Sequence, residues 1–206
     1  MELHRIKHII FDLGGVILNL REESTVEAFA AISRLSKAEI SKRFFVFDDY
    51  PKFEMGLLTD SAFRQSVRSN FDIEAEDERL DAALNAMLLD IPLARLELLD
   101  KLKTSFRLFL LSNTNNIHLG CFNNKVRELT GEGSLERFFI KSYYSHQVKL
   151  RKPDPSIFKL VLDEQHCKPE ETLFLDDNQS NLDGAATLGI STFHIKNPDQ
   201  LFELFT

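Results

Sequence analysis

Three short polar clusters follow apolar runs in the sequence and contain the residue types that phosphate chemistry needs. They are Asp12, the pair Ser112 and Asn113, and the pair Asp176 and Asp177. A carboxylate can attack phosphorus as a nucleophile, and neighbouring carboxylates are suitable ligands for Mg²⁺. The hydroxyl of Ser112 and the backbone N–H of Asn113 are suited to hold a phosphoryl oxygen. The clusters therefore indicate the transfer of a phosphoryl group.

A fourth element, residues 151–155, reads Arg-Lys-Pro-Asp-Pro and supplies a cation. Proline restricts the residue before it to an extended conformation, so this loop should hold Lys152 in a fixed position. The ammonium group would pair with the phosphate and reduce the repulsion between that anion and Asp12. Lys149 and Arg151 are alternative cations nearby.

Attack by Asp12 would produce an aspartyl phosphate, but two anions must first approach each other. Mg²⁺ removes this repulsion and prefers one or two carboxylates together with several waters. We expect Asp12 and Asp177 to bind it directly, and Asp176 to bind it directly or through water. The carbonyl oxygen of Gly14 is a further candidate ligand. Each polar cluster also has a simpler interpretation, as a turn or as the cap of a helix.

Strands must bring these clusters together, because they lie far apart in the sequence. Apolar runs at residues 9–11, 107–111 and 172–175 predict buried strands, with further strands at 140–144 and 191–195. Helical patterns alternate with the later strands, which indicates right-handed crossovers. The expected fold class is α/β, a doubly wound and mostly parallel sheet. Ligand sites in such sheets lie at the carboxyl ends of the strands, so the clusters should converge on one crevice.

Residues 19–95 differ from the rest of the chain, because they show helical periodicity and no convincing strand. This pattern predicts a small helical cap inserted between two core segments, residues 1–18 and 96–206. We expect four helices in the cap, one of which begins at the capping-box sequence of residues 36–39.

The cap offers a few candidate residues for the site, although simpler roles are favoured for them. The segment that begins at Glu54 could reach the substrate, but a turn at Gly56 before a capped helix is the preferred interpretation. The phenylalanines at 44, 45 and 47 are expected first as core residues and second as walls of a dry pocket under a closed cap.

The composition excludes several classes of protein. The 206 residues are 43% hydrophobic and 28% charged, which suits one core plus a small second unit. A net charge of -7 without a basic stripe argues against nucleic acid as a partner, and no apolar stretch is long enough to span a membrane. Cys121, Cys167, His118 and His146 are expected in packing or surface roles. We expect a cytoplasmic enzyme with a small phosphorylated metabolite as its partner, and the sequence does not indicate an oligomeric state.

Four motifs, in this order along the chain, resemble those of the haloacid dehalogenase superfamily. They are Phe-Asp-Leu-Gly-Gly-Val at 11–16, Leu-Leu-Ser-Asn at 110–113, Lys-Pro-Asp at 152–154 and Phe-Leu-Asp-Asp-Asn at 174–178. The residues within these motifs are similar to those of a branch that contains glucose-1-phosphate phosphatases and the N-terminal domains of some epoxide hydrolases. The resemblance implies a Mg²⁺-dependent phosphatase with a cap that closes over the substrate and excludes water.

Two positions depart from the pattern of the family. Phosphatases of this superfamily usually carry a second aspartate two residues after the nucleophile, as general acid and base, whereas this chain has Gly14. Without that acid, substrates with an acidic leaving group should react best, and sugar 1-phosphates meet this condition. The second departure is Asn181, where many relatives have a carboxylate near the lysine.

Two other functions stay open at this point. One is the hydrolysis of a 2-haloacid by Asp12, a reaction that needs no metal, so the acidic pair Asp176 and Asp177 argues against it. The other is a catalytically weak protein that binds a phosphorylated metabolite, for which Gly14 is the only support.

Overall fold

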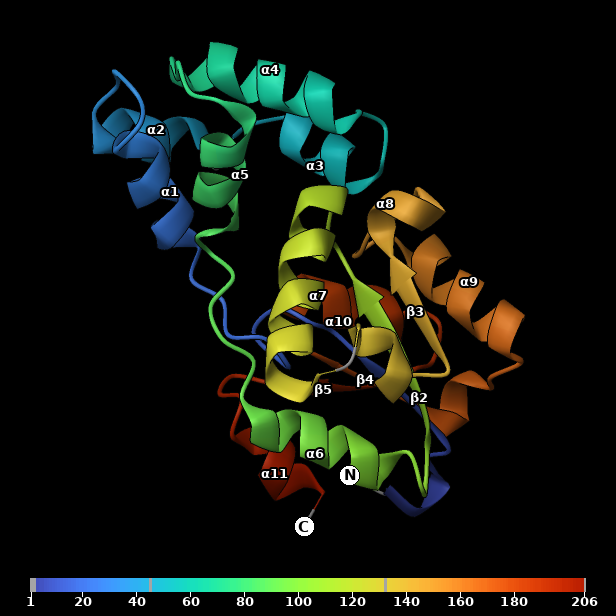
Figure 1. Ribbon diagram of the computed structural model, residues 1–206. Helices are drawn as coiled ribbons and strands as arrows, with labels where there is room; N and C mark the ends of the chain where they lie inside the picture. The colour runs from blue at the N-terminus through green and yellow to red at the C-terminus, as the bar shows by residue number, and fades with distance from the viewer. Residues whose placement is uncertain (1–2, 45, 132, 206) are drawn as a thin grey trace.

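The sheet of this protein is parallel, as the sequence predicts. A computed structural model describes residues 3–44, 46–131 and 133–205. The strands in this part of the chain are β1 (His8–Phe11), β2 (Arg107–Ser112), β3 (Lys141–Tyr144), β4 (Thr172–Asp176) and β5 (Ser191–His194). Their order across the sheet is β3-β2-β1-β4-β5, and each neighbouring pair is parallel. The expected α/β fold class is confirmed (Figure 1).

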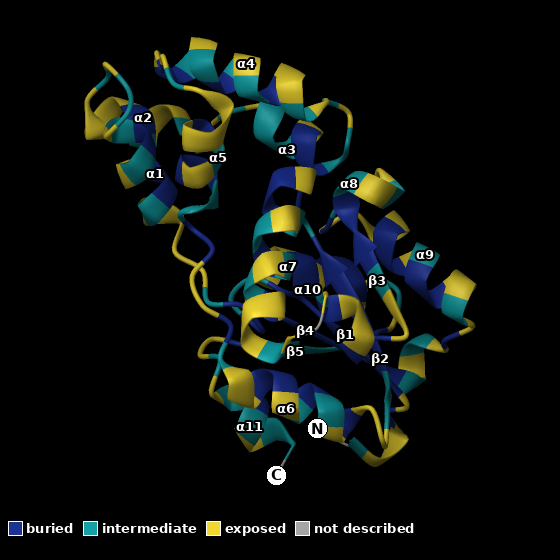
Figure 2. Ribbon diagram, viewed as in Figure 1, coloured by how far each residue is buried: buried dark blue, intermediate teal, exposed yellow. Residues whose placement is uncertain are grey.

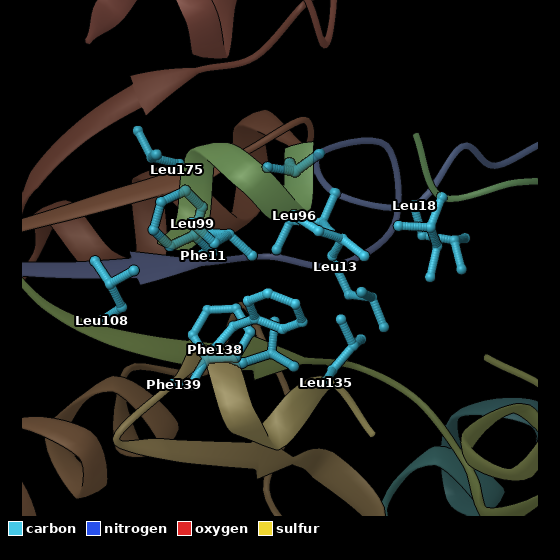
Figure 3. Packing of buried hydrophobic residues seen from close by; sticks show 14 of the residues in the cluster. Phe11, Leu13, Leu18, Leu96, Leu99, Leu108, Leu135, Phe138, Phe139 and Leu175 are labelled. Atoms are coloured by element: carbon cyan, nitrogen blue, oxygen red, sulfur yellow. The ribbon is translucent and has the colours of Figure 1, made fainter. Parts of the chain in front are cut away.

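Helices cover both faces of the sheet, because alternate residues of each strand point to opposite sides. On one face, Ile9 and Phe11 pack with α6 (Leu93–Leu102) and α7 (Asn116–Thr130), as Figure 3 shows in part. On the other face, Ile10 packs in a second cluster. The helices of that cluster are α9 (Pro155–Gln165) and α10 (Gln179–Ala186). Figure 2 shows the buried central strands between helices whose outer sides are exposed.

A separate group of helices lies beyond the carboxyl ends of the strands and has its own apolar core (Figure 1). These helices are α1 (Glu22–Ala30), α2 (Lys37–Phe44), α3 (Asp49–Glu54), α4 (Asp60–Phe71) and α5 (Asp77–Asn85). The expectation of four helices was wrong, because α3 is too short to show an amphipathic repeat. Phe44 and Phe47 pack in this apolar core, and Phe45 lies outside the described residues.

The predicted division between residues 95 and 96 falls inside α6. Leu96, Leu99 and Leu102 of this helix pack in the cluster against the sheet. The remaining elements are α8 (Ser145–Val148), α11 (Gln200–Leu204) and three short 3-10 helices at Leu3–Arg5, Leu135–Phe138 and Pro169–Glu171. Both cysteines are free thiols. Among the described residues, no helix has the length and apolar character needed to cross a membrane.

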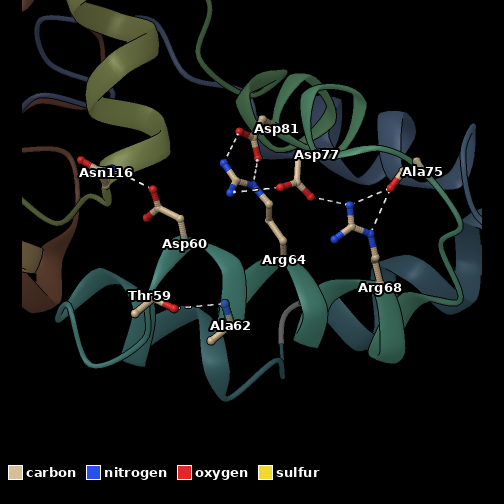
Figure 4. Close-up of polar contacts among 9 residues, drawn as sticks. All are labelled: Thr59, Asp60, Ala62, Arg64, Arg68, Ala75, Asp77, Asp81 and Asn116. Carbon is tan, nitrogen blue, oxygen red and sulfur yellow. Dashed lines mark hydrogen bonds and ion pairs between the residues drawn. The ribbon is translucent and has the colours of Figure 1, made fainter.

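Charged pairs join the cap helices to one another (Figure 4). Arg64 on α4 makes two hydrogen bonds of 2.7 and 2.8 Å to the carboxylate of Asp81 on α5, and Arg68 pairs with Asp77 at 2.6 Å. A separate contact joins cap and core, since Asn116 of α7 donates to Asp60 at 2.8 Å. Partly exposed pairs of this kind contribute little energy singly.

A close approach of two backbones fixes the loop that carries Lys152. A Cβ atom built at Gly184 of α10 would lie 2.1 Å from the carbonyl oxygen of Pro153. Helix α10 can therefore approach the loop this closely only because position 184 is glycine.

We expect the variant Gly184→Ala to lose about 1–3 kcal/mol of unfolding free energy, because the added methyl group forces the loop or the helix to move. The matched control is Gly120→Ala on α7, where nothing lies within 4 Å of the added Cβ. That variant should gain about 0.5–1 kcal/mol, because alanine is the better helix former. Urea unfolding of both proteins checks the pair. Equal stabilities would contradict the close contact.

Candidate active site

The carboxyl ends of the strands face the cap and carry the predicted residues. Asp12 directly follows β1 and its N–H donates to the carbonyl of Leu175 at 2.9 Å, Ser112 ends β2, and Asp176 ends β4. The arrowheads of β2 and β3 point toward the cap (Figure 1). An open cavity of about 430 Å³ lies there. Its walls include Asp12, Gly14, Ser112, Asn113, Lys152 and Asp177. The structure therefore brings the predicted site residues together at one crevice.

Lys152 lies between two carboxylates at the centre of this crevice. Its Nζ atom is 2.6 Å from Oδ1 of Asp12 and 2.7 Å from Oδ2 of Asp176, and its side chain is 1% exposed. Burial by itself would lower the pKa of Lys152, but the two carboxylates outweigh it and raise the pKa. Of the alternative cations, Lys149 is exposed and Arg151 pairs with a cap residue. The structure thus places Lys152 as the cation of the site.

The side chain of Asn113 holds the backbone of Lys152. Its Oδ1 accepts from the Lys152 N–H at 2.9 Å, and its Nδ2 donates to the Lys152 carbonyl at 2.9 Å. An amide side chain carries both a donor and an acceptor, so it can bind the N–H and the carbonyl of the same residue. The sequence analysis considered only the backbone N–H of Asn113 and missed this role. The order of the motifs contained no signal for it, because the two residues are 39 positions apart.

Asp176 and Asp177 are adjacent but have different surroundings. Asp176 is fully buried, and its oxygens accept from Lys152, from the N–H of Asn178 at 2.8 Å and from Nδ2 of Asn181 at 3.0 and 3.1 Å. A carboxylate in place of Asn181 would face Asp176 with like charge, whereas the amide donates to it. Asp177 is exposed and lines the cavity. Asp176 is therefore engaged by protein donors, and Asp177 faces the open space.

The donor set fits a hard divalent cation. One oxygen from each of Asp12, Asp176 and Asp177 lies within 4.8 Å of the others, and Lys152 supplies one positive charge against three carboxylates. Burial raises the pKa of Asp12 to about 7, with Lys152 opposing the rise and Asp176 adding to it. The pKa of Asp177 is also raised, by partial burial of its otherwise exposed carboxyl group and by Asp176. Gly15 leaves room for this carboxylate, because a Cβ atom added at position 15 would lie 2.1 Å from an oxygen of Asp177.

A smaller cavity of about 120 Å³ lies next to the first one under the cap. The two cavities share five wall residues, which are Gly14, Leu20, Glu22, Ser112 and Asn113. The inner wall is mostly apolar, with polar groups from Tyr50, Glu54 and His118. A phosphate in the outer cavity would therefore place the rest of its molecule in a space formed by cap and core together.

Glu54 and Gly56 fasten the cap to the core. The expected turn is present, with Gly56 at φ +63°, and a Cβ there would lie 2.1 Å from the carbonyl oxygen of His146. Glu54 is buried and pairs with Arg151, whose Nη2 lies 2.8 Å from its Oε2. Burial raises the pKa of Glu54, and Arg151 opposes the rise. This ion pair connects the cap to the residue directly before Lys152.

His118 has the packing role that the sequence analysis expected. Its Nδ1 lies 2.8 Å from Oδ1 of Asn85, and its Nε2 lies 3.2 Å from the hydroxyl of Tyr50. Burial lowers the pKa of His118 to about 4, so the ring is neutral. The imidazole thereby joins α7 of the core to α5 and α3 of the cap. Tyr50 was missed from the sequence, because it lies on the short helix α3.

Comparisons with known proteins agree with this geometry. A sequence model of haloacid dehalogenase-like hydrolases matches residues 6–189. The chain is 30% identical over 193 residues to a D-ribitol-5-phosphate phosphatase of Bacteroides thetaiotaomicron, covering 93% of each protein. It is 25% identical to (S)-2-haloacid dehalogenase 4A of Burkholderia cepacia, covering 92% of this chain and 83% of that protein. A crystal structure of a HAD family enzyme from Bacteroides thetaiotaomicron, in complex with magnesium and inorganic phosphate, superposes with a TM-score of 0.84. That enzyme is 37% identical, covering 92% of this chain and 93% of its own.

The different surroundings of the two adjacent aspartates predict different effects of substitution. Asp176→Asn removes a charged acceptor from buried Lys152 and should cost about 1.5–3 kcal/mol of unfolding free energy, with or without Mg²⁺. Asp177→Asn should leave the metal-free stability unchanged or increased, because it removes a negative charge beside Asp176.

Thermal unfolding in the presence and absence of Mg²⁺ checks both variants. The wild type should gain stability on adding Mg²⁺, and Asp177→Asn should lose most of that gain. The reverse order, with the larger loss of Mg²⁺ stabilisation in Asp176→Asn, would mean that the two residues have been assigned the wrong way round.

Proposed function

The chain belongs to the haloacid dehalogenase-like hydrolases, and on this premise we propose that it is a phosphatase that cleaves small phosphorylated carbohydrates with the help of Mg²⁺. One observation carries the proposal: Lys152 is buried between Asp12 and Asp176 at a cavity that Asp177 also lines. A buried carboxylate held beside a lysine and a second, open carboxylate is suited to attack a phosphate anion.

In the proposed reaction, a carboxylate oxygen of Asp12 attacks phosphorus while the bond from phosphorus to the alcohol oxygen breaks and the alcohol leaves. Water then hydrolyses the resulting aspartyl phosphate to inorganic phosphate and restores Asp12. Ser112 and the N–H of Asn113 hold the phosphoryl oxygens, and Lys152 offsets their charge. Mg²⁺, held by Asp12, Asp177 and the carbonyl of Gly14, would neutralise the negative charge of the attacking and attacked groups. The role left to Asp176 is to position Lys152.

We propose that the insertion at residues 19–95 acts as a cap over this reaction. The inner cavity supports this role, because its wall takes residues from both parts of the chain. Its mixture of apolar surface with Tyr50, Glu54 and His118 suits a small molecule that carries hydroxyl groups. Water would be excluded from the phosphorus atom while the alcohol is still bound.

Two substrate classes are candidates within this proposal. Sugar 1-phosphates are favoured by the absence of an acid at Gly14, since the anomeric hydroxyl is an acidic leaving group. An alditol 5-phosphate is favoured by the printed name of the relative from Bacteroides thetaiotaomicron. Relative rates of phosphate release from the two classes distinguish them.

The nucleophile and the metal are tested together with an aryl phosphate. We expect Asp12→Asn to reduce turnover to background while the protein remains folded, because the variant keeps the volume and removes the attacking charge. Chelation of the metal should abolish the activity of the wild type, and added Mg²⁺ should restore it. A variant that keeps a tenth of the wild-type rate would remove Asp12 from the role of nucleophile.

The same measurements address the other functions. Release of chloride from 2-chloropropionate that a chelator does not affect would favour a dehalogenase. Binding of beryllofluoride without turnover of any phosphate ester would favour a binding protein. We expect neither result, since the group of carboxylates formed by Asp12, Asp176 and Asp177 suits a site that works with a metal.

A further inference from the structure

We propose that Glu22 of the cap supplies the proton that position 14 cannot supply, acting first as general acid and then as general base. This inference rests on the proposed phosphatase function and adds a catalytic residue to it. Its basis is the position of Glu22 at the boundary between the two cavities.

The boundary between the cavities is where the scissile bond must lie. The phosphate belongs in the outer cavity, beside Asp12 and Lys152, and the alcohol belongs in the inner cavity under the cap. The bond between phosphorus and the leaving oxygen then lies beside the five wall residues that both cavities share. Glu22 is the member of that set with a titratable side chain, since the others are a glycine, a leucine, a serine and an asparagine.

The backbone that leads to Glu22 is held in place. Leu20 forms an antiparallel bridge with Leu88, and the N–H of Arg21 donates to the carbonyl of Met87 at 2.9 Å. The side chain of Leu20 lies beside Gly14, with one methyl carbon 3.3 Å from the position of an added Cβ. Leucine therefore occupies the space next to position 14, and Glu22 follows two residues later, in the first turn of α1.

The other titratable groups of the inner wall are committed to other contacts. Glu54 is paired with Arg151 and lines only the inner cavity. Both ring nitrogens of His118 have partners, and its lowered pKa keeps it neutral. Burial raises the pKa of Tyr50 well above its ordinary value, which makes it a poor acid.

The surroundings of Glu22 suit a group that must hold and release a proton. Glu22 is exposed at the mouth of the cavities, but partial burial of its carboxyl group raises its pKa, and the neighbouring carboxylate of Glu23 adds to the rise. Tyr50 and Glu54 face the same inner cavity, and neither brings a positive charge to it. A carboxyl group whose pKa moves toward neutrality is a better general acid than one with the ordinary value.

The proposed reaction has two steps, formation of the aspartyl phosphate and its hydrolysis. The Asp12 oxygen bonds to phosphorus, the bond from phosphorus to the leaving oxygen breaks, and the Glu22 proton passes to that oxygen to give the alcohol. Water then bonds to phosphorus while Glu22 takes its proton, and the bond from phosphorus to the Asp12 oxygen breaks. Inorganic phosphate leaves, and both carboxyl groups return to their starting states.

The test is the dependence of rate on the leaving group in the wild type and in Glu22→Gln, in the presence of Mg²⁺. The variant should lower kcat/KM for an alditol phosphate by about 10²- to 10⁴-fold, because a primary alkoxide leaves poorly without a proton. For p-nitrophenyl phosphate, whose leaving group needs no proton, kcat/KM should change little. This second substrate also shows that the variant is folded.

The later step provides an independent readout. Glu22→Gln lacks the base that activates water, so hydrolysis of the aspartyl phosphate should limit the rate. A burst of p-nitrophenol close to one equivalent of enzyme is expected in the variant. The matched control is Glu27→Gln, an exposed carboxylate of the same helix that lines neither cavity, which should keep the wild-type rates for both esters.

The outcomes separate this inference from the function on which it rests. An equal loss of kcat/KM for both esters, or no loss for either, would overturn the role of Glu22 and leave the phosphatase intact. A wild type that releases no phosphate from p-nitrophenyl phosphate with Mg²⁺ would overturn both.

Discussion

The arrangement of the site depends on the ammonium group of Lys152, buried between the carboxylates of Asp12 and Asp176. Removing such charges from water is costly, so they remain ionised only where each finds a partner. Lys152 satisfies two carboxylates that would otherwise repel each other. The neighbouring residues act on this contact: Asn113 holds the lysine backbone, and Asn181 donates to Asp176. The strand ends can hold Asp12 and Asp176 close together because the positive charge of Lys152 lies between the two carboxylates.

The location of the proposed site residues could be predicted because their types are restricted and they stand at strand ends. Asp12 and Ser112 follow apolar runs that fix both the strand and its end, and the parallel sheet then brings them to one edge. The different surroundings of Asp176, which is buried, and Asp177, which is exposed, could not be predicted in the same way. Adjacent residues at a strand end point in opposite directions, so only the packed structure shows which one faces the interior.

The cap was predictable as a helical insertion but not in its contacts. Its longer helices have an amphipathic repeat or a capping box, and these are local signals. The short helix α3 has neither, yet it carries Tyr50 and Glu54 to the inner cavity. Where a cap helix meets the core depends on tertiary packing between residues far apart in the chain, as the 97 positions between Glu54 and Arg151 illustrate.

The pair of Glu54 and Arg151 has a consequence for how long ligands stay bound. In the proposed reaction, each opening of the cap would have to separate this 2.8 Å pair and the contact of Gly56 on the core. If the cap opens in the proposed reaction, these neighbouring contacts would have to break together, and opening would be an all-or-none event rather than a gradual loosening. Release of the alcohol and of phosphate would then share one barrier with cap motion. The residence time of the products would depend on a contact one residue away from Lys152, the proposed phosphate-binding lysine.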